Sequence, residues 1–287
     1  MSSEGFAGLR VLALESRRAV EMAKLIAYSG GRAIVAPAMR EVPLESNTEA
    51  LAFASALVGG TFDMVIFLTG IGTRTLTRIA EMVYPREQYV AALKRVVVVA
   101  RGPKPIAALR ELGVPVGLAV PEPNTWRELL RALDESADSR PLKGCRIAVQ
   151  EYGVPNPDLL AGLAERGALV SRVPVYEWAL PEDTGPLREA VAAVACGEVD
   201  VILFTTSVQV MHLVQTATDM KLEESLRRAF KRILIGSIGP TTSEQLREHG
   251  FVADFEPTHP KMGVLVKEAA GRSAELLLKK RQRSSDA

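Results

Sequence analysis

The sequence has 287 residues, of which 47% are hydrophobic and only 5% aromatic, so valine, leucine, isoleucine and alanine must supply the core. This length favours two compact domains, since single hydrophobic cores stop growing at roughly 250 to 300 residues. The 35 basic and 34 acidic residues leave a net charge of +1. This balance excludes a global field that attracts nucleic acid, so an anionic ligand must be bound by local groups.

Short apolar segments alternate with helical patterns along the chain, which is typical of βα units in a parallel sheet. In chain order, the predicted strands are LRVLALE, RAIVAPA, MVIFLT, RVVVVA, CRIAVQE, ALVSRVPVY, VDVILFTT and RILIGSI. The predicted helices occupy residues 17–29, 47–59, 71–82, 103–112, 125–135, 156–166, 185–196, 207–217, 223–229, 241–249 and 261–279. The final KKRQRSSDA is expected to be a frayed basic tail, whose deletion should leave activity intact.

The chain contains an internal repeat. DMVIFLT at 63 aligns with DVILFTT at 200, and RVVVVARGPKPIAALRELG at 95 aligns with RILIGSIGPTTSEQLREHG at 232, both at an offset of 137. GLRVLALE at 8 matches GCRIAVQE at 144 at an offset of 136. We therefore predict two similar, flavodoxin-like α/β lobes with parallel sheets, and a ligand cleft between them beyond the carboxyl ends of the strands.

Two extended, proline-bearing segments, RAIVAPAMREVPLE and ALVSRVPVYEWALPED, occupy equivalent places in the two copies. If they pair as crossing strands, one lobe is assembled from both chain ends. We therefore predict a discontinuous first lobe, an inserted second lobe, a two-stranded linker and a basic C-terminal tail. The first lobe comprises residues 1–38 and 178–272, and the inserted lobe comprises 43–170. The linker strands are 32–45 and 168–183, and the tail is 273–287.

The stretch GPTTSEQLREHG places two hydroxyls behind a Gly-Pro turn, where a predicted strand gives way to a helix. Proline at the first helical position costs no hydrogen bond, and the free N–H groups of a helix start suit a carboxylate or phosphate. Gly239, Thr241 and Thr242 are therefore candidate anion ligands. The first copy has Gly102 and Lys104 in this region, and there only Lys104 offers charge. Helix capping alone explains either turn equally well.

Two further strand ends carry hydroxyls. FLTGIGTRT offers Thr69 and Gly70, and FTTSVQ offers Thr206 and Ser207. We expect four capped helix starts, at matching levels of the two lobes, to line both walls of the cleft with donors to anions. GIGTRT lacks both the GxxxxGK[ST] pattern and a full GxGxxG, so it indicates a nucleotide site only weakly.

The sequence has no strong motif for a catalytic nucleophile or a metal site. Its two cysteines, Cys145 in a predicted strand and Cys196 in a predicted helix, are expected to be buried, inert thiols in a reduced compartment. Tyr176 in VPVYEW stands out, because a phenol on the predicted linker could donate a hydrogen bond to a leaving oxygen. Aromatic packing at a domain junction explains this tyrosine equally well.

These features together resemble the uroporphyrinogen-III synthase family. The resemblance is carried by FTTS at 204–207, VPVYEW at 173–178 and SIGPTTSEQLREHGF at 237–251, followed by ADFEPTHPKMGVLVKEA. It covers residues 8 to 270, and the GPTT turn with its following helix is its most specific element. It implies two similar α/β lobes joined by a two-stranded linker.

The resemblance also implies a cofactor-free lyase of tetrapyrrole and heme biosynthesis. Such an enzyme closes the linear tetrapyrrole hydroxymethylbilane with loss of water and inversion of the last pyrrole ring. Tyr176 is then the candidate proton donor. The candidate substrate-binding residues are Arg17, Thr69, Gly70, Gly102, Lys104, Thr206, Ser207, Gly239, Thr241 and Thr242.

One departure from the family pattern affects the first-copy turn, where Pro103 and Pro105 replace backbone donors. Lys104 is expected to compensate by charge. A solvated helix face explains Arg17 as well as a carboxylate clamp does.

Two alternatives stay open at this stage: a non-enzymatic two-lobed binding protein for a small anion, similar in plan to periplasmic solute-binding proteins, and a regulatory domain. The N-terminus lacks the pattern of an export signal, and no run approaches the roughly 20 apolar residues that span a bilayer. We therefore expect a cytoplasmic monomer with a small-molecule substrate, no metal or cofactor, and no nucleic-acid or membrane partner.

Overall fold

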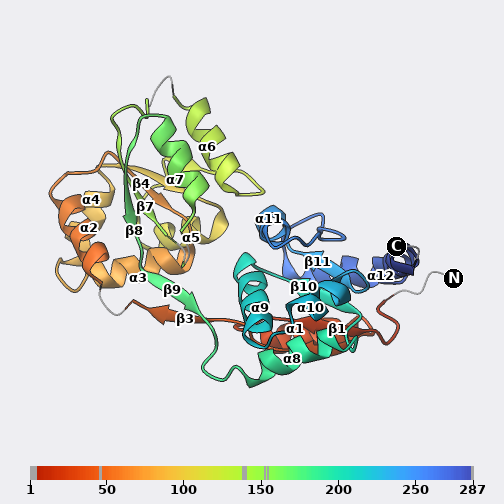
Figure 1. The fold of residues 1–287 in the computed structure, drawn as a ribbon. Helices are drawn as coiled ribbons and strands as arrows, with labels where there is room; N and C mark the ends of the chain where they lie inside the picture. Colours follow the sequence, from red (N-terminus) through yellow and green to blue (C-terminus); the bar gives the residue numbers. More distant parts are fainter. Residues whose placement is uncertain (1–4, 45–46, 138–140, 152, 154, 286–287) are drawn as a thin grey trace. The chain divides into compact units, whose positions relative to one another are not determined.

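The computed structural model describes residues 5–44, 47–137, 141–151, 153 and 155–285 (Figure 1). The chain forms two compact units, Met1–Arg40 with Ala179–Ala287 (unit 1) and Glu41–Trp178 (unit 2). Some ends of the predicted first lobe, linker and tail, at residues 1–4, 45 and 286–287, lie outside the described residues. Over the described part of the chain, no helix has both the length and the apolar character needed to cross a membrane.

Unit 1 has a parallel four-stranded sheet with the order β11-β10-β1-β2. Its strands are β1 (Arg10–Ala13), β2 (Arg32–Val35), β10 (Val201–Phe204) and β11 (Leu234–Ser237). Its helices are α1 (Ala19–Tyr28), α8 (Gly185–Ala195), α9 (Ser207–Asp219), α10 (Glu223–Phe230), α11 (Pro240–Glu248) and α12 (Met262–Ser285).

Unit 2 has a parallel five-stranded sheet with the order β6-β5-β4-β7-β8. Its strands are β4 (Met64–Phe67), β5 (Val97–Ala100), β6 (Leu118–Ala119), β7 (Arg146–Gln150) and β8 (Leu169–Val173). Its helices are α2 (Thr48–Val58), α3 (Gly70–Ala80), α4 (Arg86–Leu93), α5 (Pro103–Glu111), α6 (Trp126–Glu135) and α7 (Pro157–Glu165). The sequence patterns had not predicted α4 or the two-residue β6.

The predicted pair of parallel-sheet α/β lobes is thus confirmed. A separate two-stranded sheet pairs β3 (Arg40–Pro43) with β9 (Tyr176–Ala179), at the two places where the chain passes from one unit to the other.

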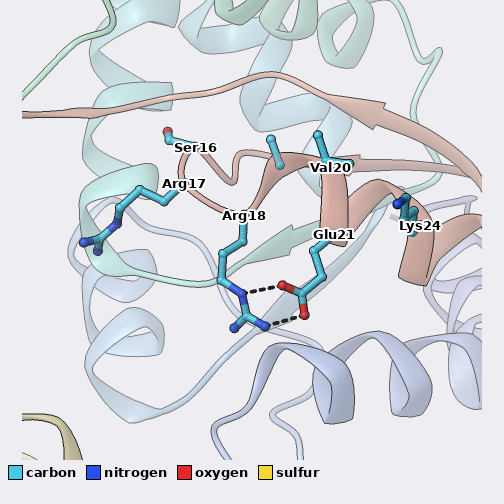
Figure 2. A pocket seen from close by; sticks show the side chains of 7 residues that line it. Ser16, Arg17, Arg18, Val20, Glu21 and Lys24 are labelled. Carbon is cyan, nitrogen blue, oxygen red and sulfur yellow. Dashed lines mark hydrogen bonds and ion pairs between the residues drawn. The ribbon is translucent and has the colours of Figure 1, made fainter.

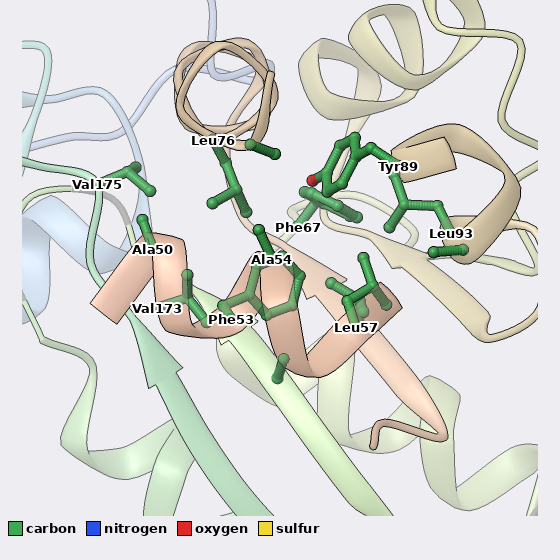
Figure 3. Packing of buried hydrophobic residues seen from close by; sticks show 14 of the residues in the cluster. Ala50, Phe53, Ala54, Leu57, Phe67, Leu76, Tyr89, Leu93, Val173 and Val175 are labelled. Atoms are coloured by element: carbon green, nitrogen blue, oxygen red, sulfur yellow. The ribbon is translucent and has the colours of Figure 1, made fainter. Parts of the chain in front are cut away.

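The two sheets repeat one layered arrangement. In each strand, alternate residues face opposite sides, as the twofold period of a strand requires. One face of the unit 1 sheet packs on α8 to α11 and the other packs on α1 and α12. One face of the unit 2 sheet packs on α2 to α5, and the other packs on α6 and α7. Figure 3 shows the first of these unit 2 layers, where Leu76 of α3 and Tyr89 of α4 lie near Phe67 of β4.

An ion pair at the amino ends of the central strands is also repeated. In unit 2, Asp63 accepts hydrogen bonds from the backbone and guanidinium nitrogens of Arg146. In unit 1, Asp200 accepts the equivalent bonds from Arg10. The bonds from Arg146 lower the pKa of Asp63 to about 2. Burial opposes ionisation of Asp200, but the bonds from its arginine partners outweigh burial and lower its pKa to about 2.

The prediction of a frayed C-terminal tail is wrong for the residues that the structure describes, because α12 continues as a helix to Ser285. Lys280 forms an ion pair with Asp254, whose carboxylate also accepts the N–H of Ile235 in β11. Arg281 donates to Asp200 at 2.9 Å. Deleting residues 279–287 would therefore remove ion pairs that hold the end of α12 to unit 1, so this segment is part of the fold.

We expect Asp200→Asn to lower the free energy of unfolding by about 2 kcal/mol at pH 7, because a neutral amide cannot replace a carboxylate bonded to two arginines. Asp63→Asn is the matched control. It should cost about 1 kcal/mol or less, because Asp63 has one arginine partner and a side chain that is 44% exposed.

The stabilisation also has a defined pH range. The folded pKa of Asp200 lies below its ordinary value of 3.8, so the stabilisation is present above about pH 4 and is lost as the pH falls towards 2. Urea unfolding from pH 7 to pH 2 measures the difference between the wild type and Asp200→Asn. Equal stabilities at pH 7 would contradict the prediction.

Candidate functional site

The carboxyl edge of the unit 2 sheet brings two helix starts together. Phe67 at the end of β4 and Ala100 at the end of β5 are paired in register, so the turns that follow them lie side by side. Thr69 is the N-cap of α3, and its hydroxyl accepts the N–H of Gly72 at 3.0 Å. Gly102 is the N-cap of α5. The predicted residues Thr69 and Gly102 therefore lie on neighbouring turns.

Close packing explains both glycines of GIGTRT. A Cβ atom at Gly70 would lie 2.6 Å from the backbone oxygen of Lys104, at the start of α5. A Cβ atom at Gly72 would overlap the side-chain amide of Gln150. The two glycines let α3 approach α5 and β7, so their presence needs no phosphate loop. Lys104 has an exposed side chain beside this edge.

The carboxyl edge of unit 1 repeats the arrangement with different side chains. Phe204 and Ser237 are paired in register at the ends of β10 and β11. Thr206 is the N-cap of α9 and Gly239 is the N-cap of α11, but neither provides a side-chain cap. Of the four expected capped helix starts, only that of α3 has a side-chain cap. The expectation of four capped starts is therefore wrong.

All four helix starts, including the capped start of α3, leave backbone N–H groups without a partner among the described residues. The first N–H groups of an α-helix have no acceptor within the helix. Among the described residues, no acceptor is present for the backbone N–H groups of Gly70, Ile71, Lys104, Ser207, Val208 and Thr241. By contrast, the N–H of Thr242 donates to Gly239 at 3.1 Å. Each unit thus has two neighbouring helix starts that carry a partial positive charge.

The two Gly-Pro turns differ in their need for glycine. Gly102 has φ = 89°, in the left-handed region, and its added Cβ would lie 3.1 Å from the side chain of Asn124. Gly239 has φ = 168°, which is extended backbone, and the nearest atom to its added Cβ is 3.8 Å away.

We therefore expect Gly102→Ala to lower the free energy of unfolding by about 1 to 2 kcal/mol, the cost of an L-residue in the left-handed region. Gly239→Ala is the matched control and should change stability by less than about 0.5 kcal/mol. Urea unfolding of the two variants measures both effects. A larger loss in Gly239→Ala than in Gly102→Ala would contradict this account of the turns.

A hollow at the end of β1 adds positive charge to unit 1. It is lined by residues 16–21 and Lys24 around the start of α1, including the predicted Arg17 (Figure 2). Arg18 is paired with Glu21, whereas Arg17 extends away from that pair in Figure 2. Hydrogen bonds from Arg18 lower the pKa of Glu21. Arg17 and Lys24 are exposed at this hollow.

The hydroxyl group of Tyr176 lies 3.2 Å from that of Thr69, the N-cap of α3. The tyrosine is 3% exposed, and its ring meets the ring of Trp178 edge-on at 5.5 Å between centroids. Its ring belongs to the core layer of unit 2. The structure therefore brings together the phenol, the Thr69 hydroxyl and the amide of Gly72 in one hydrogen-bonded chain.

Sequence reasoning missed two residues of these edges, Gln150 and Gln209. Both are fully buried, and each bonds to a turn that leads into α3 or α9. A glutamine at the end of the apolar run CRIAVQE was a signal that could have identified the first of them.

Comparison with known proteins decides the family. The family model of Uroporphyrinogen-III synthase HemD matches residues 20–267. The chain belongs to the uroporphyrinogen-III synthase family. A putative uroporphyrinogen-III synthase of Methanothermobacter thermautotrophicus is 32% identical over 238 residues, which cover 82% of this chain and 87% of the relative. The uncharacterized protein YjjA of Bacillus subtilis is 30% identical over 273 residues, which cover 93% of this chain and 97% of that protein.

A solved structure supports the same assignment. A mutant uroporphyrinogen III synthase of Thermus thermophilus is 26% identical, with a TM-score of 0.72, and the match covers 95% of this chain and 100% of that one. The predicted resemblance, fold class and lyase activity are thus confirmed, and a non-enzymatic anion binder is not favoured.

Proposed function

We propose that this uroporphyrinogen-III synthase acts on hydroxymethylbilane by binding its carboxylates at the helix starts of the two carboxyl edges. The observation that carries the proposal is a set of first-turn amides, from two helix starts in each unit, that have no acceptor among the residues the structure describes. Amides at a helix start attract carboxylates through hydrogen bonds and the helix dipole. A linear tetrapyrrole with carboxylates on every ring is a ligand of matching charge.

The proposed contacts in unit 1 are the amides of Ser207 and Thr241, the nearby hydroxyls of Thr206 and Thr242, and the backbone at Gly239. Thr241 is half-buried at the second position of α11, so both its amide and its hydroxyl are placed for a carboxylate. Arg17, at the adjacent strand end, adds charge that suits a propionate or acetate.

The proposed contacts in unit 2 are fewer. Gly70 contributes its amide, and Lys104 contributes an amide and an exposed ammonium group. Pro103 and Pro105 carry no N–H, so α5 has fewer donors than α11. Gly102 shapes the turn, and Thr69 positions the amide of Gly72 and the phenol of Tyr176.

Tyr176 is the proposed proton donor. The Thr69 hydroxyl accepts the Gly72 N–H, so it can donate its own hydrogen to the oxygen of Tyr176. The phenolic hydrogen is then directed away from Thr69, towards a departing hydroxyl group of the substrate. Electron release from the pyrrole breaks the carbon–oxygen bond, and the transferred proton makes the leaving group water.

We further propose that the enzyme works in the cytoplasm as a monomer. Cys145 and Cys196 are both free thiols, which agrees with a reducing compartment. Cys145 is half-buried and Cys196 is exposed, so the expectation of two buried thiols is wrong. Burial raises the pKa of Cys145, so its thiol is less reactive than an ordinary one.

The proposal is tested by supplying the purified protein with enzymatically generated hydroxymethylbilane and separating the product isomers. We expect the type III isomer without added metal or nucleotide. Exclusive formation of the spontaneous type I isomer would overturn the proposal.

A further inference from the structure

The central strands of unit 2 are joined at their carboxyl ends by a side-chain amide. The ladder between β4 and β7 ends at the pair Phe67 and Gln150. Beyond it, Oε1 of Gln150 accepts the N–H of Thr69 at 3.3 Å, and Nε2 donates to the backbone oxygen of Glu151. The glutamine amide thus occupies the place of the next peptide pair, where the strands diverge.

The central strands of unit 1 are joined in the same way. The ladder between β1 and β10 ends one step earlier, at the pair Ala13 and Leu203. Beyond it, Oε1 of Gln209 accepts the N–H of Thr205 at 2.8 Å, and Nε2 donates to the backbone oxygen of Leu14 at 3.1 Å. The N–H of Thr205 and the oxygen of Leu14 each lie one repeat position before the groups that Gln150 binds in unit 2. This shift matches the ladder, which is one pair shorter in unit 1.

The two glutamines are not equivalent in the repeat. Gln150 comes from a strand, and its counterpart in the other copy is Leu14. Gln209 comes from a helix, and its counterpart is Gly72. The added Cβ of Gly72 would overlap the Gln150 amide, so the strand glutamine fills the space that a helix side chain would need. Each unit therefore has one buried glutamine amide in this place, supplied by a strand in unit 2 and by a helix in unit 1. Because the two glutamines are at different positions of the repeat, common ancestry alone does not explain why both units have such an amide.

We propose that Gln150 and Gln209 are positioning residues that hold the turns into α3 and α9 for substrate binding. Gln150 fixes the peptide of Thr69, whose hydroxyl contacts Tyr176. Gln209 fixes Thr205, also through its hydroxyl at 2.9 Å, next to the N-cap of α9. Their role in turnover depends on the proposed function. The hydrogen bonds of their side-chain amides across the central strands, here called the amide bridges, do not depend on it.

The first experiment compares Gln150→Leu and Gln209→Leu with Gln88→Leu, a control at an exposed position of α4. Each buried variant should lower kcat/KM at least tenfold at a temperature where it is fully folded. Amide exchange followed by NMR should be at least tenfold faster at Thr69 or Thr205, respectively. Unchanged kcat/KM in the folded variants would overturn the positioning role.

A rescue experiment copies the unit 1 arrangement into unit 2. Gly72→Gln combined with Gln150→Leu supplies a helix glutamine and a strand leucine, as Gln209 and Leu14 do. We expect the double variant to have at least threefold higher kcat/KM than Gln150→Leu. A double variant no better than Gln150→Leu would show that the two glutamines do not serve the same role.

A stability experiment distinguishes failure of this inference from failure of the proposed function, because it needs no substrate. Gly72→Ala should lower the unfolding temperature by about 3 °C or more in the wild-type background, where the methyl group meets the amide of Gln150. In the Gln150→Ala background it should raise the unfolding temperature, since alanine favours a helix over glycine. The same sign in both backgrounds would overturn the bridge geometry, whether or not the wild type makes the type III isomer.

Discussion

Tyr176→Phe is expected to lower kcat by about 10- to 100-fold, at or below the lower end of the range for a general acid, because the pyrrole itself helps to expel the leaving group. The ring stays in place in the core layer of unit 2. The variant loses the hydroxyl that forms a hydrogen bond with Thr69, so its free energy of unfolding should fall by about 1 kcal/mol or less. Steady-state rates of type III isomer formation and urea unfolding together measure this contrast.

Tyr89→Phe is the matched control for this prediction. Tyr89 lies in the same core layer and is fully buried, so its change to phenylalanine removes one buried hydroxyl within α4, a helix that supplies none of the proposed contacts. Its kcat should stay within about twofold of the wild type. Equal rates for Tyr176→Phe and the wild type would remove Tyr176 from the catalytic assignment and leave it a packing role.

Thr241→Asp is expected to raise KM about tenfold while leaving stability unchanged or slightly higher. A carboxylate in the first turn of a helix is favourable by about 0.3 to 1 kcal/mol, because it faces the positive end of the helix dipole. The same charge repels a substrate carboxylate bound at α11. Repulsion at 4 Å is about 1 to 4 kcal/mol, depending on solvent access. A tenfold effect corresponds to about 1.4 kcal/mol, which lies within this range.

Ser225→Asp is the control for this second prediction. Ser225 is the third residue of α10, a helix that does not follow a strand at the carboxyl edge. This variant adds the same charge in a first turn, and its KM should match the wild type. A KM for Thr241→Asp within twofold of that for Ser225→Asp would indicate that α11 does not bind a carboxylate.

The repeat could have supplied more of the fold than the hydrophobic patterns did. Helix α4 was missed because REQYVAAL has weak amphipathic character, but it lies at an offset of 137 from the predicted helix α10. The end of α12 was missed because the basic run was interpreted by composition. Its order depends on Asp200 and Asp254, which are distant in sequence.

The sequence predicted where the candidate edges lie, but not which of their groups form hydrogen bonds. Parallel strands place the following turns at one edge, so Thr69 and Thr241 could be located from the sequence. Which helix starts lack a cap depends on backbone geometry, and this separated Thr69 from Thr206. The role of Gln150 could not be predicted from the sequence. It depends on how closely its amide lies to Gly72, which belongs to a different element.

The most direct test of carboxylate binding at the helix starts is NMR titration of backbone amides with the type III product under anaerobic, reducing conditions. We predict saturable shifts at Gly70, Lys104, Ser207 and Thr241, with first-turn amides of α4 and α10 unchanged. Saturable binding that leaves all four of these amides unshifted, and shifts other residues instead, would contradict the account.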